Sequence, residues 1–573
     1  MNLELASSYN ELLAKILIEE LFRNKITKAF ISPGSRSTPL TSAVAYHPGF
    51  ETQMHFDERG AAFSALGYAR ATGNPGVLIC TSGSAGANYF PAICEASVDA
   101  LPMIVLTADR PRELHAVGAN QTFDQHNLFG KQVRAFLNFE PPDGYTEFRD
   151  ILERFSTTIQ RSLQYTKGAV HINCMFREPL EFKKSKKNYA YLIDDIDKWT
   201  NSSKPFIKFK QIKNQNVVTP IFNSKLPTIL VAGALQTKQE QKAVILFAEK
   251  NNLPIFPDIR SGIRLSDKCK NIIPYYDHII LSQQMKKNKS FQVIHVGGNI
   301  VSKRLVQFVE SSEIKSYTVI HNSLHAYNPH HKLTDDISGS IEKNLKVLSK
   351  SIKPFQVKFL SEMKEANQKV HALFNSNLKE FSELTVARAI SQHVRNKSFL
   401  CTANSLSVRC LDMYADISDK DISLVSNRGL SGIDGTIATA VGYALGAKKR
   451  GTLLIGDLAF HHDINSLSLV SKSKYPIVIV LLNNNGGKIF SYLPIAKQKE
   501  IYTEYFETPQ NMIFEDSAKQ YKLQYVAVDS LDTFISAYKL AQKSKQSTII
   551  EVSLQDSTPL QVQKSIMKEI KKL

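Results

Sequence analysis

The sequence predicts an α/β protein built from three doubly wound domains with mostly parallel sheets. Short apolar runs rich in β-branched residues alternate with helix-length segments that carry apolar residues at helical spacing. Several of these runs end in small or polar residues, as expected where the carboxyl ends of parallel strands form a ligand-binding edge. The length of 573 residues also fits three or four domains of about 150 residues each.

The composition is typical of a globular protein with a sizeable core. Hydrophobic residues make up 43% of the chain and charged residues 22%. The apolar runs fall short of the ~18 residues that a membrane span needs. Residues 1–10 also lack the basic and then apolar pattern of a secretion signal. We therefore expect a cytoplasmic protein without a membrane span.

The net charge of +18 favours either an anionic partner or a Lys-rich solvated surface. The strongest basic cluster, residues 183–187, falls in a segment that is expected to be a linker. The sequence shows no basic helix interleaved with aromatic residues and no nucleic-acid-binding motif. We therefore expect small anionic molecules, and not nucleic acid, as partners.

The first domain is expected at residues 1–182. A helix is predicted over 11–24 and a strand over 28–31, and the strand runs into a loop that contains Ser35 and Arg36. Backbone amides, hydroxyl groups and a guanidinium group at such a strand-loop-helix junction suit an anion. Taken by itself, however, this loop is better explained as a plain capped turn.

Glu58 belongs to the segment His-Phe-Asp-Glu-Arg-Gly, residues 55–60, just before a predicted helix. A carboxylate at this position commonly caps the helix, and the alternative is an acid held in a cofactor site. Further strands are predicted over 76–80 and 103–106, and each again ends in a loop of small or polar residues, the second of which contains Arg110. This repetition is more specific than any single loop.

The middle of the chain carries weaker signals. Residues 183–225 are Lys-rich and irregular and are expected to be a linker, followed by a central α/β domain at 226–350 and a helix-prone, polar connector at 351–383. Gly297 and Gly298 end a predicted strand, but the third glycine of a dinucleotide-binding fingerprint is missing. We therefore expect the central domain to be structural.

The third domain is expected at residues 384–573. Strands predicted over 452–455 and 477–482 flank a helix-length segment and form a βαβ unit. Because the crossover makes the two strands parallel, their polar ends should emerge at the same edge of the sheet.

The residues that follow these two strands offer oxygen atoms to a ligand. Asp457 brings a carboxylate, Asn484 brings an amide oxygen, and Gly486 lets a backbone carbonyl approach because it has no side chain. Three hard oxygen donors suit Mg²⁺ better than Zn²⁺. A buried aspartate cap followed by an Asn-Gly turn is the alternative. His461 and His462 are expected to cap the helix or to face solvent.

Several motifs together resemble those of the thiamine-diphosphate-dependent enzymes, and in particular the branch that serves menaquinone biosynthesis. The spacing of Asp457 from Asn484 is similar to the metal-diphosphate motif of the family, although Leu458 stands where many members have glycine. The resemblance appears in order over essentially the whole chain. It is carried by residues 31–40, 55–60, 106–111, 118–121, 302–304, 426–435 and 456–487.

The resemblance implies three α/β domains, namely a pyrimidine-binding, a central and a diphosphate-binding domain. It implies thiamine diphosphate and Mg²⁺ or Mn²⁺ as cofactors. The implied reaction is the decarboxylation of 2-oxoglutarate and the 1,4-addition of the resulting succinyl-semialdehyde carbanion equivalent to isochorismate, with release of CO₂. A homodimer or a dimer of dimers is also implied, with active sites shared between the first domain of one subunit and the third domain of another.

The resemblance further assigns roles to residues. Glu58 matches the glutamate that hydrogen-bonds N1′ of the aminopyrimidine, and Ile433 matches the bulky residue that holds the cofactor bent, with core packing as the alternative. The implied metal ligands are Asp457, Asn484 and Gly486. The implied cofactor-binding set is Glu58, Ile433, Gly456, Asp457, Asn484, Gly486, Ile489 and Phe490. The implied catalytic set is Glu58, Arg36, Arg110, Gln121, Ser405, Arg409 and Arg428.

The two implied substrates carry four carboxylates, and arginine suits planar, bidentate carboxylate recognition. The implied substrate-binding set is Ser35, Arg36, Arg110, Asn120, Gln121, Lys303, Arg304, Ser405, Arg409, Arg428 and Leu493. Arg409 and Arg428 are assigned to 2-oxoglutarate, and the other basic residues of the set mainly to isochorismate. Ile489, Phe490 and Leu493 are expected to form an apolar lid, with plain core as the alternative.

Other functions fit the sequence less well. Another thiamine-diphosphate-dependent 2-oxoacid decarboxylase, or an acetolactate-synthase-like carboligase, would not need so many arginines. A non-catalytic protein that kept the fold would be expected to lose Glu58, Asp457 or Asn484, and all three are present. A nicotinamide-dependent oxidoreductase would need the Gly-rich fingerprint that is missing here.

Overall fold

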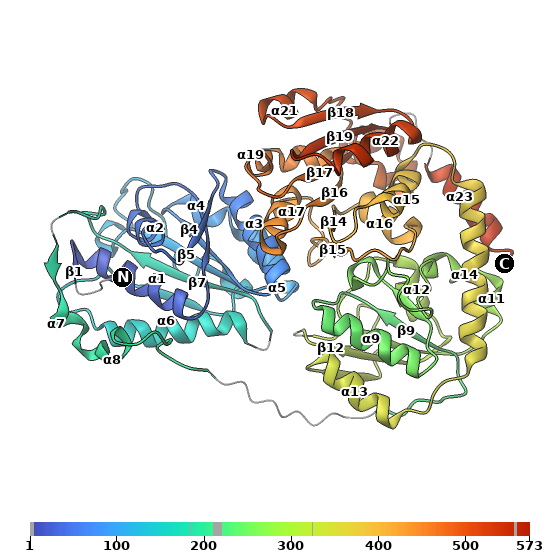
Figure 1. Ribbon diagram of the computed structural model, residues 1–573, viewed down its shortest axis with the longest axis horizontal. Coiled ribbons are helices and arrows are strands. Elements are labelled where there is room, and N and C mark those ends of the chain that lie inside the picture. The colour runs from blue at the N-terminus through green and yellow to red at the C-terminus, as the bar shows by residue number, and fades with distance from the viewer. Residues whose placement is uncertain (1–4, 165, 185, 210–219, 324, 555–558) are drawn as a thin grey trace. The chain divides into compact units, whose positions relative to one another are not determined.

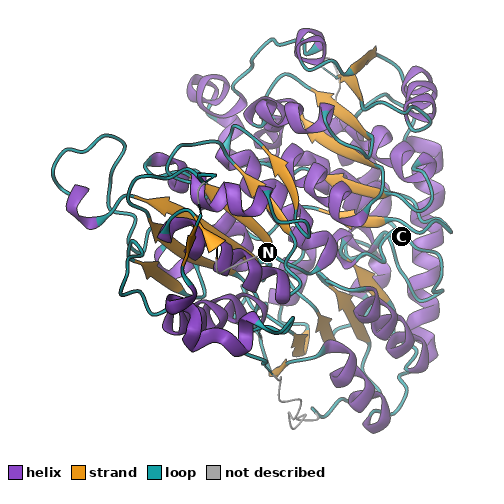
Figure 2. Cartoon of the chain, turned by 60° about the vertical axis from the view of Figure 1, so that its left-hand side comes forward, coloured by secondary structure: helices purple, strands orange, loops and turns teal. Residues whose placement is uncertain are grey.

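The protein is described from a computed structural model, which covers residues 5–573 except 165, 185, 210–219, 324 and 555–558. The chain forms two compact units. The first unit comprises Met1–Lys213, Ile437–Lys448 and Asn465–Ser473, and the second comprises Asn214–Thr436, Lys449–Ile464 and Lys474–Leu573. Helices flank the strands of the sheets in both units (Figure 2).

The first unit contains a six-stranded sheet of order β3-β2-β4-β5-β7-β6, in which every neighbouring pair is parallel. The inner strands are buried along their whole length, which explains why their sequences are mostly apolar. The edge strand β3 is largely exposed. The strands are β2 (Lys28–Ile31), β3 (Glu51–Met54), β4 (Gly76–Cys80), β5 (Met103–Asp109), β6 (Phe136–Phe139) and β7 (Ala169–Met175).

Helices cover both faces of this sheet (Figure 1). Helices α1 (Tyr9–Arg23), α2 (Thr38–Ala45) and α6 (Phe148–Leu163) share one hydrophobic core with it. Helices α3 (Glu58–Thr72) and α5 (Phe90–Val98) also contact its strands, but their buried residues lie outside that core. The loops after β2, β4 and β5 therefore all open at the carboxyl edge of a doubly wound sheet.

The second unit contains two further parallel sheets, of order β10-β9-β11-β12-β13 and β15-β14-β16-β17-β19-β18. The central sheet consists of β9 (Thr228–Ala232), β10 (Ile255–Pro257), β11 (Phe291–Val296), β12 (Ile314–His321) and β13 (Asp335–Ser338). The third sheet consists of β14 (Phe399–Thr402), β15 (Ser423–Val425), β16 (Gly451–Gly456), β17 (Ile477–Asn483), β18 (Gln524–Val528) and β19 (Thr548–Ser553). Among the described residues only β1 (Leu5–Ala6) and β8 (Lys187–Asn188) pair antiparallel. The prediction of three α/β domains with mostly parallel sheets is confirmed.

The predicted βαβ unit is present in the third sheet. Strands β16 and β17 are parallel neighbours, and Gly456 lies opposite Leu482. The crossover is not one helix, however, because it is broken into α18 (Asp457–His462), a 3-10 turn at Ile464–Ser466 and α19 (Leu467–Ser471). The backbone leaves the helical region between these pieces at Asp463, with φ −113° and ψ 22°.

A buried polar cluster joins the central and third sheets within the second unit. The guanidinium group of Arg264 is fully buried, and its Nε and Nη2 donate to the backbone oxygen of Asp412 at 3.0 and 2.8 Å. The carboxylate of Asp412 accepts bonds from the Tyr276 hydroxyl and from Ile259 N, each at 2.8 Å. Burial raises the pKa of this carboxyl group. The hydrophobic cluster around it runs from β9 and β11 to β16 and β17 without a break.

Regular structure also occurs in the segments expected to connect the domains. Within 183–225 the chain forms α7 (Ala190–Ile193), η3 (Asp194–Ile196) and α8 (Asp197–Thr200), while residues 210–219 lie outside the described part. Trp199 anchors this stretch to the first unit, because its Nε1 donates to Glu20 Oε2 at 2.8 Å. The segment 351–383 contains the long helix α14 (Val357–Asn377). No helix in the described chain has both the length and the apolarity needed to cross a membrane.

Candidate active site

The ends of β16 and β17 meet at one edge of the third sheet. Asp457 is the first residue of α18 and is buried. Its Oδ2 accepts a hydrogen bond from the backbone N of Gly486 at 2.6 Å, and its Oδ1 accepts one from Leu458 N at 2.9 Å. Asp457 follows β16 and Gly486 follows β17, and the two residues are therefore in direct contact.

The three consecutive asparagines that follow have different partners. Asn483 Nδ2 donates to Glu551 Oε1 at 2.6 Å, inside the sheet. Asn485 Oδ1 accepts a bond from Asn511 N at 2.8 Å, which ties the loop to a later segment. Both side chains are therefore engaged in holding the loop.

Asn484 differs from its two neighbours because the oxygen of its amide has no hydrogen-bond partner among the described residues. Its Nδ2 donates to Glu383 Oε1 at 2.9 Å. Its Oδ1 is buried and accepts no hydrogen bond from any described residue. A buried oxygen without a partner is costly in a native structure, so it calls for an explanation such as an ion or a ligand.

Gly486 is required at its position by the backbone. Its φ is +122°, and a Cβ atom there would lie 2.1 Å from the backbone oxygen of Glu507. Its own carbonyl accepts a bond from Lys488 N at 2.9 Å, and a carbonyl has a second lone pair for a ligand. The turn therefore combines close packing with an available backbone oxygen.

This donor set fits a divalent cation. Asp457 supplies a carboxylate, Asn484 an unpaired amide oxygen and Gly486 a carbonyl, which are the hard donors that Mg²⁺ and Mn²⁺ take. Burial raises the pKa of Asp457, and the bonds from Gly486 N and Leu458 N act against that rise. A bound cation would lower it further, because its charge favours the carboxylate.

In the first unit, the helix cap at the start of α3 is Asp57 and not Glu58. Asp57 Oδ1 accepts bonds from Arg59 N at 3.0 Å and Gly60 N at 3.3 Å. Glu58 is the first residue of the helix. Burial raises the pKa of Glu58, and the negative charge of Asp57 raises it further. The alternative interpretation of Glu58 was that it caps this helix. Asp57 makes the cap instead.

The loops after β2, β4 and β5 bring two guanidinium groups near each other. Arg110 Nη1 donates to Gln121 O at 2.6 Å and to the hydroxyl of Ser82. Gln121 Nε2 donates to Ser82 O at 3.0 Å. Arg36 Nη1 donates to Phe176 O at 3.0 Å. Burial lowers the pKa of Arg36 and the charge of Arg110 lowers it further, as expected for two close cations.

A buried polar network, which the sequence analysis did not single out, supports these loops. Asn173 in β7 accepts a bond from Gln125 Nε2 at 2.9 Å and donates to Asp109 Oδ2 at 2.9 Å. All three side chains are buried. Because Asp109 precedes Arg110 and Gln125 follows the loop of Gln121, the network fixes the backbone at both ends of this loop.

The sequence contains an indication of this network, namely polar residues inside two apolar strands. Asn173 and His171 interrupt the apolar run of β7, and Thr107 interrupts that of β5. Thr107 Oγ1 lies 2.8 Å from His171 Nε2 and donates to Asn173 Oδ1 at 2.8 Å. Polar residues inside a central strand must find partners, so such interruptions predict a buried network.

A second group of implied residues follows β14 and β15 in the second unit. Arg409 Nη1 donates to Ser405 O at 2.7 Å, and burial lowers the pKa of Arg409. Arg428 Nη1 donates to Asn404 Oδ1 at 3.0 Å, next to Ser405 in the chain. Ser405 has a φ of +67°, a conformation that is rare for residues other than glycine and often marks functional sites.

The implied apolar contacts are not core residues in this structure. Ile433 is 39% exposed, and its loop is held by a bond from Asn404 Nδ2 to Gly432 O at 2.5 Å. Leu493 is 43% exposed, and Ile489 and Phe490 are half-buried. The partial exposure of these apolar side chains is consistent with the predicted lid, which stays a prediction.

The remaining implied residues are placed as follows. Lys303 is the first residue of α12 (Lys303–Glu310) and is exposed. Arg304 forms an ion pair with the buried Asp277, so its guanidinium group is already engaged. Ser35 and Asn120 are exposed in the loops that carry Arg36 and Gln121.

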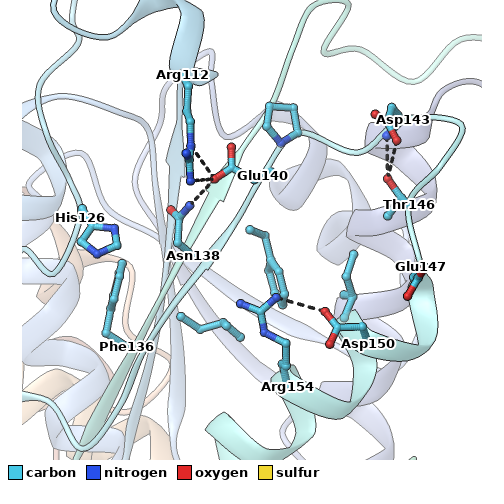
Figure 3. Close-up of a pocket in the computed structure, with 14 residues that line it drawn as sticks. Arg112, His126, Phe136, Asn138, Glu140, Asp143, Thr146, Glu147, Asp150 and Arg154 are labelled. Carbon is cyan, nitrogen blue, oxygen red and sulfur yellow. Dashed lines mark hydrogen bonds and ion pairs between the residues drawn. The ribbon is translucent and has the colours of Figure 1, made fainter.

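A cavity of about 710 Å³ lies elsewhere in the first unit, along β6 and the start of α6 (Figure 3). None of the implied site residues lines it. Its arginines pair with acids of the same cavity, Arg112 with Glu140 at 2.6 Å and Arg154 with Asp150 at 3.1 Å. Its cations are thus neutralised, and it is a poor candidate for anionic substrates.

Comparison with protein families gives one match in each part of the chain. Residues 12–128 match the N-terminal TPP binding domain of thiamine pyrophosphate enzymes. Residues 190–401 match the middle domain of thiamine pyrophosphate enzymes, and residues 414–552 match their C-terminal TPP binding domain. The matched ranges contain Glu58, Arg304 and Asp457, respectively.

Curated relatives agree over nearly the full length. The chain is 38% identical over 547 residues to a 2-succinyl-5-enolpyruvyl-6-hydroxy-3-cyclohexene-1-carboxylate synthase of Chlorobaculum parvum, which covers 94% of this chain and 93% of the relative. Enzymes of the same name from Chlorobium chlorochromatii and Salinibacter ruber are 37% and 36% identical, covering 95% and 96% of this chain and 95% and 94% of the relatives. The chain therefore belongs to the thiamine pyrophosphate enzyme family, in the branch of the 2-succinyl-5-enolpyruvyl-6-hydroxy-3-cyclohexene-1-carboxylate synthases.

Proposed function

We propose that the protein decarboxylates 2-oxoglutarate and joins the remaining four-carbon unit to isochorismate by 1,4-addition, with release of CO₂, in menaquinone biosynthesis. The observation that carries this proposal is the occurrence of the arginines in two groups that follow strands, Arg36 with Arg110 and Arg409 with Arg428. Two substrates with four carboxylates between them need such a set, because buried carboxylates must be paired.

The residues of the chain divide the work around thiamine diphosphate. When bound, the cofactor supplies the electron sink for decarboxylation, while the protein supplies orientation and electrostatics. Asp457, Asn484 and Gly486 are the residues that would hold Mg²⁺ or Mn²⁺ and, through it, the diphosphate. Glu58 would hold a proton at N1′ of the aminopyrimidine, and Ile433 would press the cofactor into its bent shape.

Turnover of 2-oxoglutarate with and without isochorismate tests the proposal. CO₂ release that depends on isochorismate, with formation of the joined product, is expected. Release of CO₂ at the same rate without isochorismate would instead favour the alternative, another thiamine-diphosphate-dependent 2-oxoacid decarboxylase or carboligase. The reaction with pyruvate as the only 2-oxoacid distinguishes an acetolactate-synthase-like enzyme from both.

The arginines are expected to separate by substrate. Arg409→Ala or Arg428→Ala should raise the KM for 2-oxoglutarate, and Arg110→Ala should raise the KM for isochorismate. Loss of a charged hydrogen-bond partner costs roughly 1.5–3 kcal/mol, which is about 10–100-fold. Steady-state kinetics with each substrate varied in turn measures the split.

A matched control is available for this experiment. Arg112 lies two residues after Arg110, but its side chain is 74% exposed and pairs with Glu140. Arg112→Ala should change neither KM by more than about twofold, because exposed ion pairs contribute little. Equal effects of Arg409→Ala and Arg110→Ala on both substrates would show that the proposed division is wrong.

We further propose a homodimer or a dimer of dimers whose sites are shared, each with Glu58 from one chain and Asp457 of the partner subunit. Glu58→Ala and Asp457→Ala should each be inactive alone. After subunit exchange, random pairing makes about half of the dimers heterodimers, and each of these contains one intact site. Activity should then return to about a quarter of wild type, whereas no recovery after confirmed exchange would contradict sharing.

The cytoplasmic location expected from the sequence stays a prediction.

A further inference from the structure

The orientation of the Asn484 side chain is the starting point. An asparagine amide has nearly the same shape either way round, so its hydrogen bonds decide which end is oxygen. Here Nδ2 donates to Glu383 Oε1 at 2.9 Å, and Oδ1 is left buried without a partner among the described residues. Asn484 is 7% exposed and Glu383 is 1% exposed, so water does not compete freely for either group.

Glu383 can hold this amide in one orientation only. A carboxylate accepts hydrogen bonds and donates none, so it selects the NH₂ end of the amide. The oxygen is then directed to the opposite side of the side chain. In the reverse orientation, the amide oxygen would face the carboxylate, and two acceptors would repel each other.

The position of Glu383 is fixed by its helix. It is the first residue of α15 (Glu383–His393), where the helix dipole favours a negative charge. The cap of this helix is made by other residues, because Thr385 Oγ1 accepts a bond from Ser382 N at 3.0 Å. Glu383 thus stands at the helix start beside the capping pair, and its carboxylate contacts the side chain of Asn484 in the loop after β17.

We propose that Glu383 is a positioning residue for the divalent metal, which directs Asn484 Oδ1 at the cation that Asp457 and Gly486 also hold. The inference rests on the proposed metal site. Without Glu383, the amide could turn its NH₂ group towards the cation, which removes a ligand. Loss of a partner that orients a metal ligand typically lowers metal affinity 10–100-fold.

The direct test measures metal binding and not turnover. Free Mn²⁺ is titrated by electron paramagnetic resonance in the presence of saturating thiamine diphosphate. Glu383→Ala should weaken Mn²⁺ binding about 10–100-fold. Glu383→Gln should fall between this variant and wild type, because glutamine can still accept from Asn484 but can also donate to it.

Glu240 provides a matched control in the central domain. It is also a buried glutamate in the first turn of a helix, α9 (Lys238–Lys250), and its Oε1 accepts a bond from Asn322 Nδ2 at 2.7 Å. Glu240→Ala therefore breaks the same kind of Glu–Asn contact, but in a place away from the proposed metal ligands. It should leave Mn²⁺ affinity within about twofold of wild type, even where it lowers the melting temperature.

A second variant makes the orienting role specific. In Asn484→Asp both ends of the side chain are oxygen, so no partner is needed to select one. Glu383→Ala should therefore cost less than about twofold in Mn²⁺ affinity in this background, or should improve it by removing a nearby negative charge. The same 10–100-fold loss in both backgrounds would show that Glu383 acts only through general stability, and the proposal would be overturned.

Three other outcomes bear on the role of Glu383 and on the metal site. Wild-type Mn²⁺ affinity in Glu383→Ala, with a clear loss in Asp457→Ala, would overturn the role of Glu383 and leave the metal site standing. Wild-type affinity in both variants would overturn the metal site itself. A loss in Glu240→Ala as large as in Glu383→Ala would also count against the positioning role.

Discussion

Glu58→Gln is expected to lower kcat by about 10²–10⁴-fold while leaving the affinity for thiamine diphosphate within a few-fold of wild type. The amide can still hydrogen-bond the aminopyrimidine, but it cannot share a proton with N1′. The raised pKa of Glu58, which burial causes and Asp57 reinforces, favours such sharing over a fully ionised carboxylate. Steady-state kinetics and calorimetric titration of the cofactor measure the two quantities separately.

Asp57→Asn is the natural control for this prediction. Asparagine caps helices as well as aspartate does, so the start of α3 should be preserved. The substitution removes the neighbouring charge, which lowers the pKa of Glu58 and should change kcat only a few-fold. A loss below about threefold in Glu58→Gln would show that the reaction does not depend on proton sharing between Glu58 and N1′.

Asp457→Ala is expected to weaken the joint binding of metal and thiamine diphosphate by at least about 100-fold, since loss of a ligand exceeds the effect of losing an orienting partner. Asp457 is buried and accepts a hydrogen bond from Gly486 N, so its carboxylate lies beside the other proposed ligands. The proposed metal site would then lose its one charged ligand. Calorimetric titration of the cofactor at fixed Mg²⁺ gives the change.

Asn485→Ala tests whether this loss is specific to the ligand set. Asn485 lies between Asn484 and Gly486, but its side chain bonds Asn511. Its removal should loosen the loop and change cofactor affinity by less than about tenfold, as expected for loss of hydrogen bonds outside the ligand set. Equal losses in Asp457→Ala and Asn485→Ala would contradict the assignment of Asp457 as a ligand.

The centre of each sheet could be predicted from the sequence, while the edges could not. Strands β2 and β4 begin and end where the predicted strands 28–31 and 76–80 do, because a strand buried on both faces is mostly apolar. Strand β3 reads Glu-Thr-Gln-Met and is mostly exposed, so it carries no such pattern. The break in the crossover at Asp463 was missed because the pattern of Ile464, Leu467 and Leu469 was assigned to one helix-length segment, although all three residues follow the break.

The candidate site was predictable where its residues follow strands, and not where distant segments meet. The contact of Asp457 with Gly486 follows from the parallel βαβ unit. Glu383 lies 101 residues before Asn484 and looks like any acid at a helix start. The sequence could not decide between Asp57 and Glu58 as the cap, because only the geometry of the first turn separates two consecutive carboxylates.

The contacts of the loop after β17 have a consequence for how this enzyme type can diversify. Gly487 N donates to Glu507 O at 2.6 Å, Lys488 pairs with Glu507, and Asn485 holds Asn511, so the chain leaves and re-enters at one place. Residues 489–506 therefore form a loop whose two ends are held together next to the proposed metal ligands. A change in loop length costs little free energy. This loop can therefore be exchanged, lengthened or cut while the contacts at its two ends keep the proposed metal ligands in place. This segment carries Leu493 of the implied substrate-binding set, so new substrate shapes can be explored here while Asp457, Asn484 and Gly486 stay unchanged.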